Sequence, residues 1–206
     1  MAAAHVDVTT DAPTLLIVSD LGDSPSLTGV SRYIDSLDTL GHIARAIAST
    51  RRPRSTRSGF VEKSDRLNLL GVVQSAASEK PEPSPLAVAR MRMASPLEVV
   101  LTAAAGQFAP VAYGLMAMTL IERTMKLIME WQSHRLDIRQ RQSELHDQAR
   151  METSADQVRR VSGEIARTVT EEVYEYRLPD KVADIVARPI SRLAQHRVVH
   201  VESSRD

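Results

Sequence analysis

The side chains best placed for chemistry are two carboxylates near the start of the chain. Asp20 and Asp23 follow Thr14–Ser19, whose Leu, Ile and Val residues predict a buried strand. Functional groups often lie at strand ends in open sheets, so acid–base chemistry is conceivable here. Aspartate is also common in turns and helix caps. We favour the turn role, because no phosphate-binding glycine motif and no nucleophile motif accompanies the pair. The sequence therefore predicts no catalytic residue and no cofactor.

A histidine pair is the second candidate. His196 and His200 are four residues apart, which on a helix would suit a metal ion. The surrounding residues Arg197–Glu202 alternate in polarity and predict a strand, where that spacing separates the two rings by about 13 Å. We therefore expect surface histidines and no metal site. The chain has no cysteine, which excludes disulfides, thiolate ligands and thiol nucleophiles.

Positive charge is concentrated between Arg51 and Lys63, in the segment RRPRSTRSGFVEK. Such a segment could contact phosphate groups of lipid or nucleic acid. The whole chain is neutral, with 26 basic and 26 acidic residues, and only 3% of its residues are aromatic. It lacks both the overall field and the stacking platforms of nucleic-acid binders. We expect a solvated, mobile loop over residues 50–65 and no nucleic-acid partner.

The longest uncharged run extends from Val99 to Ile121 and is, at about 23 residues, long enough to cross a bilayer as one helix. Pro110 near its middle would break such a helix. We predict two helices instead, Pro96–Ala105 and a second from Ala109 onward. These could insert as a hairpin into lipid or pack in a protein core. The apolar residues of the run are Val99, Val100, Leu101, Phe108, Leu115, Leu120 and Ile121.

The elements that must position these residues follow from hydrophobic spacing. Leu27–Ile47 has apolar residues three and four apart and predicts an amphipathic helix, capped by Ser24-Pro25. Leu67–Gln74 and Leu86–Met93 predict strands. In the second of these, strict alternation places Leu86, Val88, Arg90 and Arg92 on one face and Ala87, Ala89, Met91 and Met93 on the other.

The second half of the chain predicts long charged helices. The uncharged run leads into a long charged helix, and Ala155–Tyr176 forms a further helix with a coiled-coil-like apolar seam. The seam needs a partner face, either from the chain's own helices or from another subunit. Pro189 is expected to split the next segment into two short helices, 180–187 and 190–195. The seam residues proposed for self-association are Val158, Val161, Ile165, Val169 and Val173.

The sequence as a whole predicts an α+β fold. A small sheet carries one amphipathic helix, followed by an apolar helical segment and a long charged helical extension. The expected regions are 1–95, a small α/β region; 96–178, the apolar helix pair and the charged helix; and 179–206, short helices and a final strand. The layout around Ser95-Pro96-Leu97-Glu98 resembles that of uncharacterised actinobacterial proteins in which this step begins an apolar helix. The resemblance implies no activity and assigns no residue a role.

Three functions are consistent with these patterns. The first is a non-catalytic interaction or assembly protein that self-associates through its helices as a homo-oligomer. The second is a membrane-associated signalling or defence component whose apolar hairpin enters lipid. The third, more distant, is an enzyme of unrecognised type that uses Asp20 and Asp23. No small-molecule substrate is indicated. We expect a cytoplasmic location, with membrane association as the open alternative.

Overall fold

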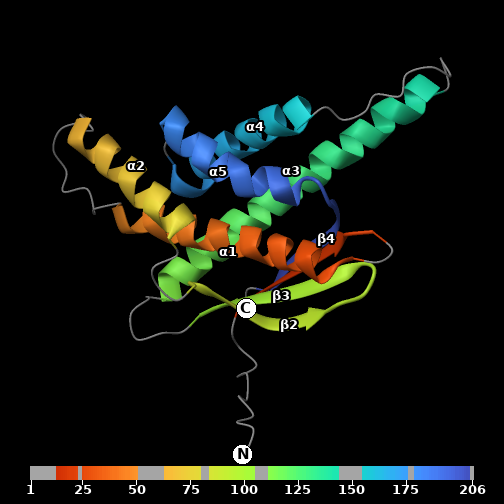
Figure 1. The fold of residues 1–206 in the computed structure, drawn as a ribbon, viewed down its shortest axis with the longest axis horizontal. Coiled ribbons are helices and arrows are strands. Elements are labelled where there is room, and N and C mark those ends of the chain that lie inside the picture. The colour runs from red at the N-terminus through yellow and green to blue at the C-terminus, as the bar shows by residue number, and fades with distance from the viewer. Residues whose placement is uncertain are drawn as a thin grey trace, which may run out of the picture.

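The structure is a computed structural model that describes residues 13–22, 25–50, 63–79, 84–104, 111–143, 155–175 and 179–204. The fold is α+β, as predicted: an antiparallel four-stranded sheet has its helices stacked on one face (Figure 1). The strands are β1 (Thr14–Asp20), β2 (Leu86–Arg92), β3 (Leu97–Ala103) and β4 (Arg197–Ser204). The helices are α1 (Leu27–Thr50), α2 (Lys63–Ser78), α3 (Val111–Ser143), α4 (Ala155–Tyr174) and α5 (Asp180–Leu193).

The sheet has the strand order β2-β3-β1-β4 and two chemically different faces. Successive side chains of a strand point to opposite faces. On β1, Leu15 and Ile17 are fully buried beneath the helices, whereas Leu16 and Val18 are half-buried on the opposite side. We call this opposite side the outer face. No helix of the described residues covers it (Figure 1).

The predicted amphipathic helix α1 lies at the centre of the core. Its stripe, which includes Leu37, is buried against α2, α3 and α5. Near its start, the Tyr33 hydroxyl shares a 2.6 Å hydrogen bond with the Ser19 hydroxyl at the end of β1, and both side chains are buried. The predicted cap was misplaced, because the helix begins at Leu27 and it is the Ser26 hydroxyl that accepts a hydrogen bond from the Gly29 amide, at 3.0 Å. This bond satisfies one of the open amides of the first turn.

The side-chain amide of Gln132 joins helix α3 to the start of β4. The Gln132 Nε2 group donates to the carbonyl oxygens of Ala194 and His196, at 3.3 and 2.8 Å. The Gln132 Oε1 atom accepts from the Val198 amide at 2.9 Å. These three bonds hold the turn between α5 and β4 against α3. Buried polar backbone groups need such partners, so Gln132 fixes where β4 enters the sheet.

The apolar seam of α4 packs within the same chain. Ile165 and Val169 are buried, and α4 contacts both α5 and α3. Beside the seam, the Tyr174 hydroxyl donates to the Ala44 carbonyl of α1 at 3.0 Å. On the surface, Arg123 of α3 forms a two-pronged ion pair with Glu172 of α4. The partner face that the seam requires is therefore supplied, at least at its centre, by the chain's own helices.

Two predicted elements were of the wrong type. Leu67–Gln74 belongs to helix α2, not to a strand. Pro96–Ala105 is not a helix: its described part contains strand β3, where Leu97, Val99 and Leu101 are buried and the residues between them are less so. The uncharged run is therefore a strand followed by helix α3, which begins at Val111. Phe108 and Pro110 lie outside the described residues.

The predicted break at Pro189 was also wrong. Helix α5 continues through this residue as a single element. A proline inside a helix removes one hydrogen bond and costs about 3 kcal/mol. Burial of the apolar face of α5, including Val186, Ile190 and Leu193, favours the continuous helix.

Membrane crossing can be assessed for the described residues alone. None of their helices combines the length and the apolar character that a bilayer span requires.

Candidate functional site

Those predicted chemistry-bearing residues that the structure describes are not gathered into one site. The Asp20 Oδ1 atom accepts a hydrogen bond from the Gly22 amide at 2.9 Å, and Gly22 has a φ of 95°. Asp20 thus makes the local turn that its residue type favours. Asp23 lies outside the described residues. Over the described ranges, no three His, Asp or Glu side chains come together in a way that could hold a metal ion.

The two histidines occupy different environments. The His196 ring meets the Tyr33 ring edge-on, with 5.8 Å between their centroids, and burial lowers the pKa of His196 below its usual value. His200 is exposed on β4, where its Nε2 atom lies 3.3 Å from a Glu202 carboxylate oxygen. One ring therefore packs against α1 and the other faces solvent.

The residues predicted for self-association and for the apolar segment lie largely in the core. Of the seam, Ile165 and Val169 are buried, and the other three residues are partly buried against the core. Of the apolar segment, Leu115 is exposed. On β3, Val99 and Leu101 are buried and Val100 is half-buried. On α3, Leu120 and Ile121 are fully buried.

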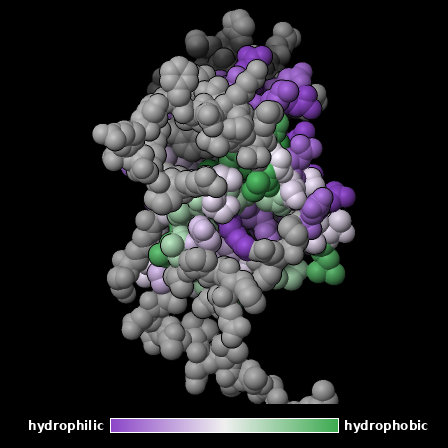
Figure 2. Space-filling model, turned by 90° about the vertical axis from the view of Figure 1, so that its left-hand side faces the viewer, coloured by the Kyte–Doolittle hydropathy of each residue, from purple (hydrophilic) through white to green (hydrophobic). Residues whose placement is uncertain are grey.

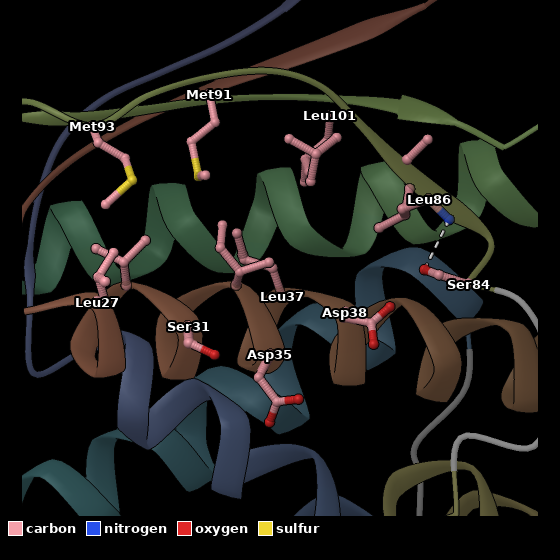
Figure 3. A pocket seen from close by; sticks show the side chains of 14 residues that line it. Leu27, Ser31, Asp35, Leu37, Asp38, Ser84, Leu86, Met91, Met93 and Leu101 are labelled. Carbon is pink, nitrogen blue, oxygen red and sulfur yellow. Dashed lines mark hydrogen bonds between the residues drawn. The ribbon is translucent and has the colours of Figure 1, made fainter. Parts of the chain in front are cut away.

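The main surface hollow is an apolar groove between α1 and the edge strand β2. It has a volume of about 470 Å³. Figure 3 shows Met91, Met93 and Leu101 projecting from the sheet toward Leu27 and Leu37 of α1. Pockets of roughly 300–1,000 Å³ are the size that ligands and short peptide segments use. We call this hollow the α1–β2 groove.

Exposed hydrophobic side chains are concentrated in this groove. Among the described residues, eight large hydrophobic side chains are exposed, and four of these line the groove. They are Leu27, Val88, Met91 and Met93, with exposed fractions of 75, 46, 42 and 49%. In the view of Figure 2, by contrast, the hydrophobic described residues form small separate areas among hydrophilic ones. Exposed hydrophobic side chains that are grouped in this way commonly mark an interaction site, whereas single ones scattered over a surface do not.

A bulge in β2 creates the apolar wall of the groove. The pairing of β2 with β3 shifts between Val88 and Arg90, so Ala89 is an extra residue. As a result Val88 and Met91 share the face that looks toward α1, while Arg90 points to the outer face. Strict alternation had predicted Val88 and Arg90 on one face, which was wrong. The apolar spacing of two and then three residues, Leu86, Val88 and Met91, is the sequence signal that could have revealed the bulge.

The lining of the groove is mostly apolar, with a few polar side chains. Its polar members are Ser31, Asp35 and Asp38 on α1 and Ser84 before β2. The Ser84 hydroxyl accepts a hydrogen bond from the Leu86 amide at 3.2 Å. Among the described lining residues, the ionisable side chains are the carboxylates of Asp35 and Asp38.

A second, shallower hollow between α3 and α4 is polar. It is lined by the Arg123–Glu172 ion pair together with Glu122 and Lys126, whose charged groups lie 2.8 Å apart. The hydrogen bonds from Arg123 lower the pKa of the Glu172 carboxyl. The Arg123–Glu172 pair connects α3 to α4, whereas Glu122 and Lys126 pair within α3.

Comparison with known protein families, with curated proteins and with solved structures found no significant match for this chain.

Proposed function

We propose that the protein is a non-catalytic interaction protein that holds an amphipathic helix of a partner in the α1–β2 groove. The observation that carries this proposal is the gathering of four exposed hydrophobic side chains, two of them methionines, in one open groove. Methionine is flexible and polarisable, and it is common on surfaces that accept helices with different side chains.

The free edge of β2 suits a partner that binds as a helix better than one that extends the sheet as a further strand. Strand addition needs a regular edge, and β2 carries the Ala89 bulge together with Arg90 and Arg92 on its outer face. Bulges and charges are the usual devices that protect a sheet edge from pairing. A partner that packs side chains into the groove does not depend on that edge.

The acidic side of the groove indicates the charge of the partner. Ser31, Asp35 and Asp38 are four and three residues apart, so they follow one side of α1 beside the groove (Figure 3). The charged side chains among the described lining residues are Asp35 and Asp38, and Asp38 lies 3.6 Å from His42. A helix with lysine or arginine beside its apolar stripe is therefore the best match.

Methionine methyl resonances provide the test. We would add a synthetic amphipathic peptide with a leucine stripe flanked by lysines to protein labelled at its methionine methyl groups. The Met91 and Met93 signals should shift, while those of the buried Met118 and Met125 should not. A peptide with the same stripe flanked by glutamates should bind roughly tenfold more weakly, because it meets the acidic side of the groove.

A matched pair of variants completes the experiment. Met91→Glu should abolish the shift at Met93, whereas Leu136→Glu, an equally exposed position on α3, should leave it unchanged. If the lysine-flanked peptide moves neither groove methionine, the proposal is wrong.

A further inference from the structure

The outer face of the sheet has an ordered distribution of charge. Residues directly opposite one another on paired strands share a face. The pairings place Arg90 beside Val100, Val100 beside Leu16, and Leu16 beside Glu202. Read from β2 to β4, this row is basic, apolar, apolar and acidic.

The neighbouring row also begins with an arginine on β2, but it has an acidic residue in its interior. It reads Arg92, Glu98, Val18 and His200 from β2 to β4. Arg92 lies 3.8 Å from Glu98 within the row. Arg90 has no ion-pair partner in the described part of the chain. The Glu202 side chain is 69% exposed, and its ion-pair partner within the described residues is His200. Arg90 and Glu202, at opposite edges of the sheet, are therefore available for contacts outside the chain.

We propose that a second copy of this chain packs on the outer face, sheet against sheet. When the strands of the two copies are aligned, two-fold symmetry allows two face-to-face arrangements. An axis across the strands would put β2 over β2 and bring like charges together. An axis along the strands, between β3 and β1, puts β2 over β4 of the other copy. In this arrangement Arg90 of each copy faces Glu202 of the partner subunit. Val100 of each copy likewise faces Leu16 of the partner subunit, so each pair occurs two times in the dimer.

Other occupants fit this face less well. An anionic membrane or a nucleic acid needs a predominantly basic surface. The two rows carry acidic residues as well as arginines, with Glu98 and Glu202 on the same face as Arg90 and Arg92. In the row that contains Arg90 the charge runs from basic at β2 to acidic at β4, and a rotated copy of this sheet presents that row in the reverse order.

The size of the face sets the expected strength of the dimer. From the spacing between strands and the rise per residue, the outer face of four strands of this length has an area of about 300–400 Å² in each copy. That is about half of the area of a standard protein interface, so the dimer should be weak and depend on concentration. The α1–β2 groove lies on the helical side of the sheet, so dimerisation leaves both grooves accessible. This inference is independent of the proposed function.

Charge-reversal variants test the proposed dimer. Its affinity is measured by sedimentation over a wide concentration range. Arg90→Glu should weaken the dimer about tenfold or more, because it sets two pairs of like charges face to face. Glu202→Arg should do the same. A mixture of the two variants should dimerise again, since each mixed dimer contains two attractive pairs. Arg188→Glu, a change at an exposed residue of α5, should have no effect.

Two results would overturn the inference. One is a wild type that remains monomeric at the highest concentration reached. The other is a dimer that the single variants do not weaken, or one that the mixture does not restore. Circular dichroism of each variant establishes that the sheet is intact, which is expected because both substituted side chains are exposed.

Discussion

Removing the Gln132 side-chain amide should uncouple α3 from the last strand. In Gln132→Ala, the Ala194 and His196 carbonyls and the Val198 amide all lose their side-chain partner. A hydrogen bond of this kind contributes about 1 kcal/mol net, so the free energy of unfolding should fall by about 2–3 kcal/mol. Urea denaturation measures this loss, and hydrogen exchange should show faster exchange at the start of β4.

A second variant, Gln132→Glu, tests whether the two carbonyl groups need a hydrogen-bond donor at this position. Gln132→Glu keeps an acceptor for the Val198 amide but points a carboxylate at two carbonyl oxygens. It should therefore be strongly destabilised at neutral pH and partly recover in acid, where the carboxyl is protonated and can donate. Ser133→Ala, at the exposed neighbouring position, is the control. A loss below about 0.5 kcal/mol in Gln132→Ala would refute the role given to this residue.

Three further outcomes are expected. Leu37→Ala, at a position that is only 1% exposed, should lower the free energy of unfolding by about 2–5 kcal/mol in chemical denaturation. Gly114→Ala should lower the thermal midpoint, because its Cβ would lie 2.6 Å from the Ala103 Cβ; in an open helix the same change is stabilising by up to about 1 kcal/mol. Burial lowers the pKa of His196, so the folded state binds its proton less readily than the unfolded chain. Stability should therefore decrease as the pH falls below about 6.5, and His196→Gln should flatten that decrease in denaturation curves measured at successive pH values.

The elements with a clear period could be predicted from the sequence. Strand β1, helix α1, helix α4 and strand β4 were each predicted with the correct type and nearly correct bounds. Each has one buried face, which produces alternation in β1 and an apolar spacing of three and four residues in α1 and α4. Strand β3 was missed because from Val99 onward the residues on both of its faces are uncharged, so most of it merged with the start of α3 into one uncharged run.

The errors elsewhere come from tertiary contacts that local patterns do not contain. Leu67–Gln74 reads as a strand, yet as part of α2 it buries Leu69 and Val73 and leaves Val72 exposed. Spacing alone cannot separate a short apolar run in a helix from one in a strand. The α1–β2 groove was missed for a related reason, because its wall depends on the bulge at Ala89.

The interior position of β1 in the sheet affects how the chain reaches its fold during synthesis. Thr14 of β1 pairs with Thr102 on one side and with Ser204 on the other. The ribosome thus releases β1 long before it completes the strand that covers its second edge. Until β4 emerges, β1 presents unpaired backbone groups, and such an edge can pair with another nascent chain. Contacts this distant in sequence also form slowly. Chains that end before β4 should therefore aggregate when they are produced, even though most of the helical layer is present.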